Sequence, residues 1–107
     1  MLVTYDRTNH RVAITGHANA GEKGKDLVCS AASILAWTLA SNVTNLHDSD
    51  PKSFRRVTIK MDEGDTVVEV SPVHDAAVVA TLVFDTVCAG FELLAKQYPE
   101  NIEYQRR

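Results

Sequence analysis

The chain has 107 residues, the length of one domain and too short for two separate hydrophobic cores. Hydrophobic residues make up 45% of it and charged residues 23%, a globular composition that excludes a disordered chain and a disulfide scaffold. The net charge of −3 at pH 7 gives no electrostatic reason for direct binding to nucleic acid. We therefore predict a single domain over residues 1–107.

Segments that direct a protein into a membrane are not expected. No uninterrupted apolar run approaches the roughly 18 residues that span a bilayer. The amino terminus, Met1–Asp6, has no basic region followed by an apolar stretch. Two cysteines, Cys29 and Cys88, are too few for a disulfide-rich secreted domain. These features predict a cytoplasmic protein with reduced cysteines and no membrane contact.

The first half of the chain reads as a hairpin, a loop and a helix. Two β-prone runs, Leu2–Tyr5 and Arg11–Thr15, flank five residues rich in turn formers. From Ala18 to Lys25 there are two glycines and no large apolar residue, so we expect a mobile loop. Apolar residues at helical spacing then run from Leu27 to about His47, and Asp26 is the candidate N-cap.

The second half repeats this order with a longer hairpin. Phe54–Met61 and Thr66–Val70 are predicted strands joined by an acidic turn, followed by a helix from about Ala76 to Tyr98 and an edge strand over Ile102–Tyr104. The expected apolar stripe of that helix is Val79, Leu82, Val83, Phe91, Leu94 and Tyr98. The order ββαββαβ predicts an α+β fold, with an antiparallel or mixed sheet and two long helices packed on one face.

Residues with the potential for catalysis lie where the first hairpin passes into the first helix. His17 falls at a strand end, and Cys29 is the third helical residue if Asp26 is the N-cap. Free backbone N–H groups and the helix dipole at that position favour a thiolate, and an imidazolium nearby favours it further. The pair therefore suits nucleophilic catalysis on a carbonyl, with N–H groups of the helix start, including that of Cys29, as oxyanion donors.

Structural roles for the same residues remain open on this evidence alone. A cysteine near the start of an apolar helix is more often a small buried side chain, and His17 would serve equally as a polar end to a strand. Cys88 is expected to be a buried structural thiol, and Trp37 a packing or dimer-interface residue. The histidines and cysteines form no zinc pattern and the acidic turn no EF-hand, so no metal and no cofactor are expected.

One set of residues resembles a family signature. It consists of Gly16-His17-Ala18, Gly21, Gly24, Asp26-Leu27-Val28-Cys29 and Ser33. The set is similar to the signature of the ribosomal-processing cysteine proteases of the Prp type, in which the catalytic histidine stands in a Gly-His-Ala triplet and the nucleophile ends an Asp-(Ile/Leu)-Val-Cys run. The similarity extends over nearly the whole chain.

This resemblance implies a function and roles for the residues that match. His17 and Cys29 would be catalytic, and Asp26 and Ser33 would support them. Gly16, Ala18, Gly21 and Gly24 would belong to a loop that gates the substrate. Members of the family act as homodimers that remove a short amino-terminal extension from ribosomal large-subunit protein twenty-seven. The competing hypotheses are a non-catalytic, ribosome-associated peptide-binding module and a thiol redox sensor.

Overall fold

The computed structural model of the protein describes residues 1–22 and 25–107. Seven elements follow one another in the predicted order: β1 (Leu2–Asp6), β2 (Arg11–Thr15), α1 (Leu27–Ser49), β3 (Phe54–Asp62), β4 (Asp65–Pro72), α2 (Ala76–Gln97) and β5 (Glu103–Arg106). No end of an element differs from its predicted position by more than two residues. The predicted ββαββαβ order is thus confirmed.

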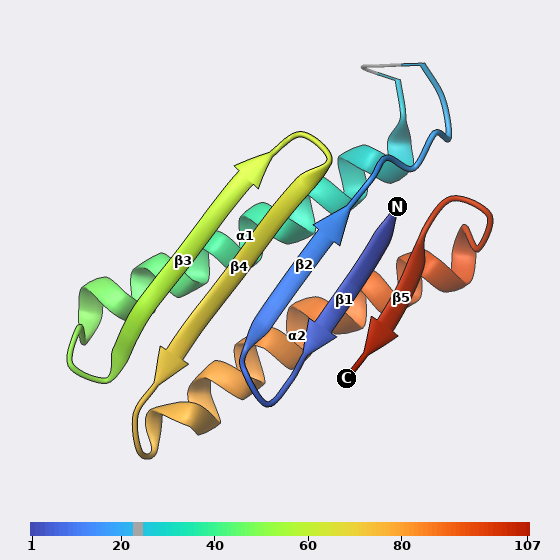
Figure 1. Ribbon diagram of the computed structural model, residues 1–107. Helices are drawn as coiled ribbons and strands as arrows, with labels where there is room; N and C mark the ends of the chain where they lie inside the picture. The colour runs from blue at the N-terminus through green and yellow to red at the C-terminus, as the bar shows by residue number, and fades with distance from the viewer. Residues whose placement is uncertain (23–24) are drawn as a thin grey trace.

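The five strands form one mixed sheet in the order β3-β4-β2-β1-β5. All neighbours are antiparallel except β1 and β5, which are parallel. Both helices lie on the same face of the sheet, and α2 returns the chain across that face before β5 begins (Figure 1). The α+β architecture with two helices on one face is therefore as predicted.

The register of the central strands places the core on the helix side. Val12 of β2 lies opposite both Tyr5 of β1 and Val68 of β4, and all three side chains are almost completely buried. Successive residues of a strand point to opposite faces, so the residues between them form the other face. On that face Arg11 lies opposite Glu69, and the two form an ion pair.

The buried face of α2 differs from the predicted stripe. Phe91 is fully buried as expected, but Val79, Leu82 and Tyr98 are exposed. The buried residues of α2 are Ala80, Phe84, Val87, Cys88 and Phe91. The prediction failed because α2 is apolar nearly all round, so periodicity alone could not determine which side faces the sheet.

The apolar character of both helices bears on the expectation about membranes, which stays a prediction. Although neither helix is an uninterrupted apolar run, α1 and α2 are each long and apolar enough, by length and composition, to cross a bilayer. This is weak evidence for a span, because the core helices of soluble proteins pass the same test. Each helix also buries one side within the common core.

Candidate active site

The start of α1 is built around the buried carboxylate of Asp26. Its Oδ1 accepts a hydrogen bond from the backbone N–H of Cys29, and its Oδ2 accepts one from the N–H of Ala20, both at 2.9 Å. These two bonds hold the pKa of Asp26 below its usual value, although burial acts in the opposite direction. The bond from Cys29 has the largest effect. The predicted N-cap is confirmed, and the carboxylate is directed at backbone donors.

Cys29 is the third residue of α1 and is half-buried. Its Sγ accepts a hydrogen bond of 3.3 Å from the backbone N–H of Ala18. Such a donor stabilises a thiolate more than a neutral thiol. The expectation that the N–H of Cys29 would bind an oxyanion is wrong for this structure, because that N–H already donates to Asp26.

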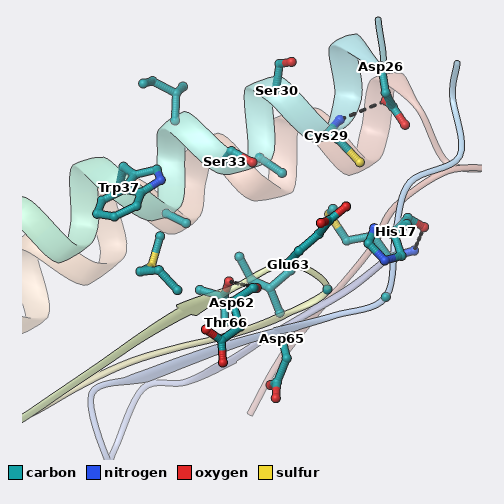
Figure 2. A pocket seen from close by; sticks show the side chains of 18 of the residues that line it. His17, Asp26, Cys29, Ser30, Ser33, Trp37, Asp62, Glu63, Asp65 and Thr66 are labelled. Atoms are coloured by element: carbon teal, nitrogen blue, oxygen red, sulfur yellow. Dashed lines mark hydrogen bonds between the residues drawn. The ribbon is translucent and has the colours of Figure 1, made fainter. Parts of the chain in front are cut away.

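His17 enters the site from the segment that follows β2. Its exposed ring lies against the turn between β3 and β4, where a Cβ added to Gly64 would be 3.0 Å from the imidazole Nε2. The backbone N–H of Gly16 donates to the carbonyl of Gly64 at 3.0 Å, which ties the two segments together. Cys29 and His17 face the same hollow from opposite sides (Figure 2).

That hollow is a cavity of about 840 Å³ between the first turns of α1, the segment after β2 and the β3–β4 turn. Ser33, one helical turn after Cys29, lines it, and so do Ile34 and Trp37 further along α1 (Figure 2). Trp37 is 56% exposed, so it lines the cavity and does not pack in the core; its role at a dimer interface stays a prediction. The β3–β4 turn, Asp62 to Asp65, forms the opposite wall of the hollow. The carboxylates of Asp62 and Asp65 pair with Lys60.

The predicted mobile loop is anchored at its first residues. Ala18 is 4% exposed, and besides its bond to Cys29 its carbonyl accepts a hydrogen bond of 3.0 Å from Asn101 Nδ2. The expectation that no burial holds this segment is therefore wrong at Ala18. Gly21 lies close to the carbonyl of Lys25, since an added Cβ would be 3.1 Å from that oxygen. Gly24 lies outside the described residues, and the gating role of the loop stays a prediction.

Two residues of the site were not found from the sequence. Gly64 was interpreted only as a turn former, yet it makes room for His17. Asn101, at the other end of the chain, carried no signal, because its link to Ala18 spans 83 positions. Both contacts depend on which segments the sheet brings together.

Cys88 differs from Cys29 in being enclosed by the core. Cys88 is 2% exposed, and burial raises the pKa of its thiol to about 12, as expected of a structural cysteine. Over residues 1–22 and 25–107, no group of three or more His, Cys, Asp or Glu side chains is placed to hold a metal ion.

Comparison with known proteins gives one family and several similar structures. The model of the family described as "Cysteine protease Prp" matches residues 2–103. The ribosomal processing protease Prp of Staphylococcus aureus with a covalently linked product peptide is 22% identical, with a TM-score of 0.77 and coverage of 99% of this chain and 98% of that one. The same protease with a substrate peptide is 23% identical, with a TM-score of 0.72 and the same coverage.

A further structure, SMU.848 from Streptococcus mutans, is 25% identical, with a TM-score of 0.63 over 98% of this chain and 90% of that one. No curated protein sequence matches this chain significantly. The solved structures agree with the fold described above, and the family model covers both His17 and Cys29.

Proposed function

Since the chain belongs to the cysteine protease Prp family, we propose that it removes a short amino-terminal extension from ribosomal large-subunit protein twenty-seven, with Cys29 as nucleophile and His17 as its proton-transfer partner. The observation that carries the proposal is the position of the Cys29 thiol. It opens onto a cavity that His17 also lines, and it accepts a backbone hydrogen bond from Ala18. The S. aureus protease has been solved with a substrate peptide and with a covalently linked product peptide.

Acylation begins when the Cys29 thiolate attacks the carbonyl carbon of the scissile bond. A carbon–sulfur bond forms, the carbonyl electrons move to its oxygen, and collapse of this intermediate breaks the carbon–nitrogen bond. The imidazolium of His17 gives its proton to the leaving amine. The products of this half are a thioester on Cys29 and a free amino terminus.

Deacylation reverses the roles. Neutral His17 takes a proton from water, whose oxygen attacks the thioester carbonyl, and the Cys29 thiolate leaves. Asp26 takes no proton in either half. It keeps the first turn of α1 in place through its bonds to Cys29 and Ala20. The position of the Cys29 sulfur relative to the cavity is therefore fixed.

Mass spectrometry of the full-length ribosomal protein, incubated with the purified chain, tests this proposal. We expect one amino-terminal cut by the wild type and none by Cys29→Ala, with a fall in rate of at least about a thousandfold. Cys88→Ala is the matched control, because it removes the other thiol from a helix without touching the cavity. It should still cleave.

Other outcomes would point to the competing hypotheses. Tight binding of the intact ribosomal protein by both wild type and Cys29→Ala would indicate a peptide-binding module. Peroxide-driven oxidation of Cys29 in a protein that cleaves nothing would indicate a redox sensor. Cleavage that survives Cys29→Ala would refute the assignment of the nucleophile.

The homodimer implied by the resemblance and the cytoplasmic location predicted from the sequence are part of the same proposal. Apolar side chains exposed on α1 and α2, among them Leu27, Val78, Leu82 and Leu93, support a state in which a second copy covers part of the helix layer. Sedimentation equilibrium should give twice the chain mass of 11.8 kDa. Fractionation of cells should place the protein with the soluble ribosomal proteins before their assembly.

A further inference from the structure

We propose that Asn101 is a positioning residue for the reaction, whose carboxamide fixes the His17–Ala18 segment against Cys29. The inference rests on the proposed roles of Cys29 and His17. Asn101 lies in the connection between α2 and β5, which meets the segment after β2 at the same end of the sheet (Figure 1). Asn101 does not line the cavity described above, so its side chain would not contact the substrate there.

Two hydrogen bonds meet at Ala18. Asn101 Nδ2 donates to the carbonyl oxygen of Ala18 at 3.0 Å, and the N–H of Ala18 donates to Cys29 Sγ at 3.3 Å. The carboxamide and the thiol therefore hold the two polar groups of a single residue. Because the methyl group of Ala18 is buried as well, the backbone there cannot turn without breaking one of these contacts.

Asn101 is itself held in place by a tight turn. Its backbone N–H and that of Ile102 both donate to the carbonyl of Tyr98, at 3.0 and 3.1 Å. The side chain of Ile102 is 2% exposed and anchors the turn in the core. The N–H of Glu103 then donates to the carbonyl of Met1 at 2.9 Å, where β5 begins to pair. A side chain on such a support is pre-organised, which is what a positioning residue requires.

Loss of the carboxamide should affect catalysis in two ways. The Ala18 N–H would no longer be held at the sulfur, so the thiolate would lose a donor. His17 immediately precedes Ala18, so its ring would lose part of the constraint that aims it into the cavity. Substrate binding should change little, because the cavity walls contributed by α1 and the β3–β4 turn remain intact.

The test compares Asn101→Ala with Asn42→Ala. Asn42 is a matched control, since its Nδ2 also donates to a backbone carbonyl, that of Thr38 at 2.8 Å, on an exposed part of α1. We expect Asn101→Ala to lower kcat about tenfold or more, with KM within about twofold of wild type. Asn42→Ala should leave both unchanged, and the two variants should melt at similar temperatures.

A second readout works without any substrate. The rate at which iodoacetamide alkylates Cys29 is followed against pH by mass spectrometry of the modified peptide. In Asn101→Ala, the pH at which the alkylation rate reaches half its maximum should rise by roughly half a unit. This is the shift expected when a thiolate loses one hydrogen bond. The other titratable groups that line the site are present in wild type and in both variants; they are the amino group of Met1, His17, Asp26, Asp62, Glu63 and Asp65.

The two readouts separate failure of this proposal from failure of the proposed function. If the wild type cleaves nothing but the alkylation profile shifts in Asn101→Ala, the positioning role stands and the assigned reaction is wrong. If kcat and the alkylation profile both match the wild type, the proposal is overturned. A loss of activity that only follows the unfolded fraction overturns it too. Should Asn101→Ala not fold, Asn101→Leu decides, because it keeps much of the shape and removes the donor without adding a charge.

Discussion

Two cysteines on two helices of the same layer have opposite chemical environments. Cys29, in the first turn of α1, is half-buried, opens onto the cavity and accepts a backbone hydrogen bond. Cys88, in the middle of α2, is 2% exposed, and burial raises its pKa to about 12. The two thiols thus differ in exposure and in hydrogen bonding: the Cys29 sulfur meets a backbone donor from the segment after β2, whereas the Cys88 sulfur is enclosed by the core.

The surroundings of the two thiols differ in the same sense. Near Cys29 the fold buries a carboxylate, Asp26, and satisfies it with two backbone N–H groups. Near Cys88 the fold buries apolar rings, including Phe84, which stacks on Tyr5 with ring centroids 6.0 Å apart. The first region holds the Cys29 thiol in place at the cavity, and the second belongs to the buried core.

The largest expected effect is a difference in alkylation. In the folded protein at pH 7, iodoacetamide should modify Cys29 at least about a hundredfold faster than Cys88, since Cys88 becomes accessible only on opening of the core. Peptide mass spectrometry after timed quenching measures both rates. In strong urea the rates should become similar, and a Cys88 that reacts as fast as Cys29 in the native state would contradict the comparison.

The same substitution at both cysteines should separate stability from activity. Cys88→Ser replaces a buried thiol, which contacts Tyr104, with a more strongly hydrated hydroxyl. It should lower the free energy of unfolding by about 1 to 3 kcal/mol while cleavage continues. Cys29→Ser should cost less than about 1 kcal/mol at its half-buried site but abolish cleavage. Urea unfolding and the cleavage assay give the two numbers. Equal stability losses would mean that the two environments are not distinct.

A smaller effect is expected at Gly64, which faces His17. Gly64→Ala would bring a Cβ within 3.0 Å of the imidazole Nε2 at a residue with φ of +73°. We expect kcat/KM to fall about tenfold as the ring is displaced, with roughly 1 kcal/mol of lost stability from the left-handed backbone. Cleavage at the wild-type rate by this variant would show that the ring does not need its present position.

The smallest effect concerns the pH dependence of the N-cap. The pKa of Asp26 is lower in the folded chain than in the unfolded one, so its stabilising contribution is complete above the unfolded value. That contribution is lost as pH falls through the lower, folded value. The stability difference between wild type and Asp26→Asn should therefore be largest near pH 7 and shrink below about pH 4. Urea unfolding at pH 7, 5 and 3 measures it, and a gap that grows with acidity would refute the assigned role.

Predictions from the sequence succeeded where the signal was local. The N-cap Asp26 and the place of Cys29 as third helical residue depend on four consecutive positions, and the structure confirms both. The predicted buried face of α2 was wrong because that helix is apolar nearly all round, and the fold buries Phe84 and Val87 instead of Val79 and Leu82. The buried start of the loop at Ala18 was missed because its partner comes from the end of the chain.

The sequence by itself determined the order of elements and the chemical character of the helix start at Cys29, because capping and periodicity act over a few residues. Only the tertiary structure decided what surrounds that sulfur. The sheet brings the β3–β4 turn beneath His17 and the connection after α2 beside Ala18. Those contacts follow from strand pairing between segments far apart in the chain, which no local pattern encodes.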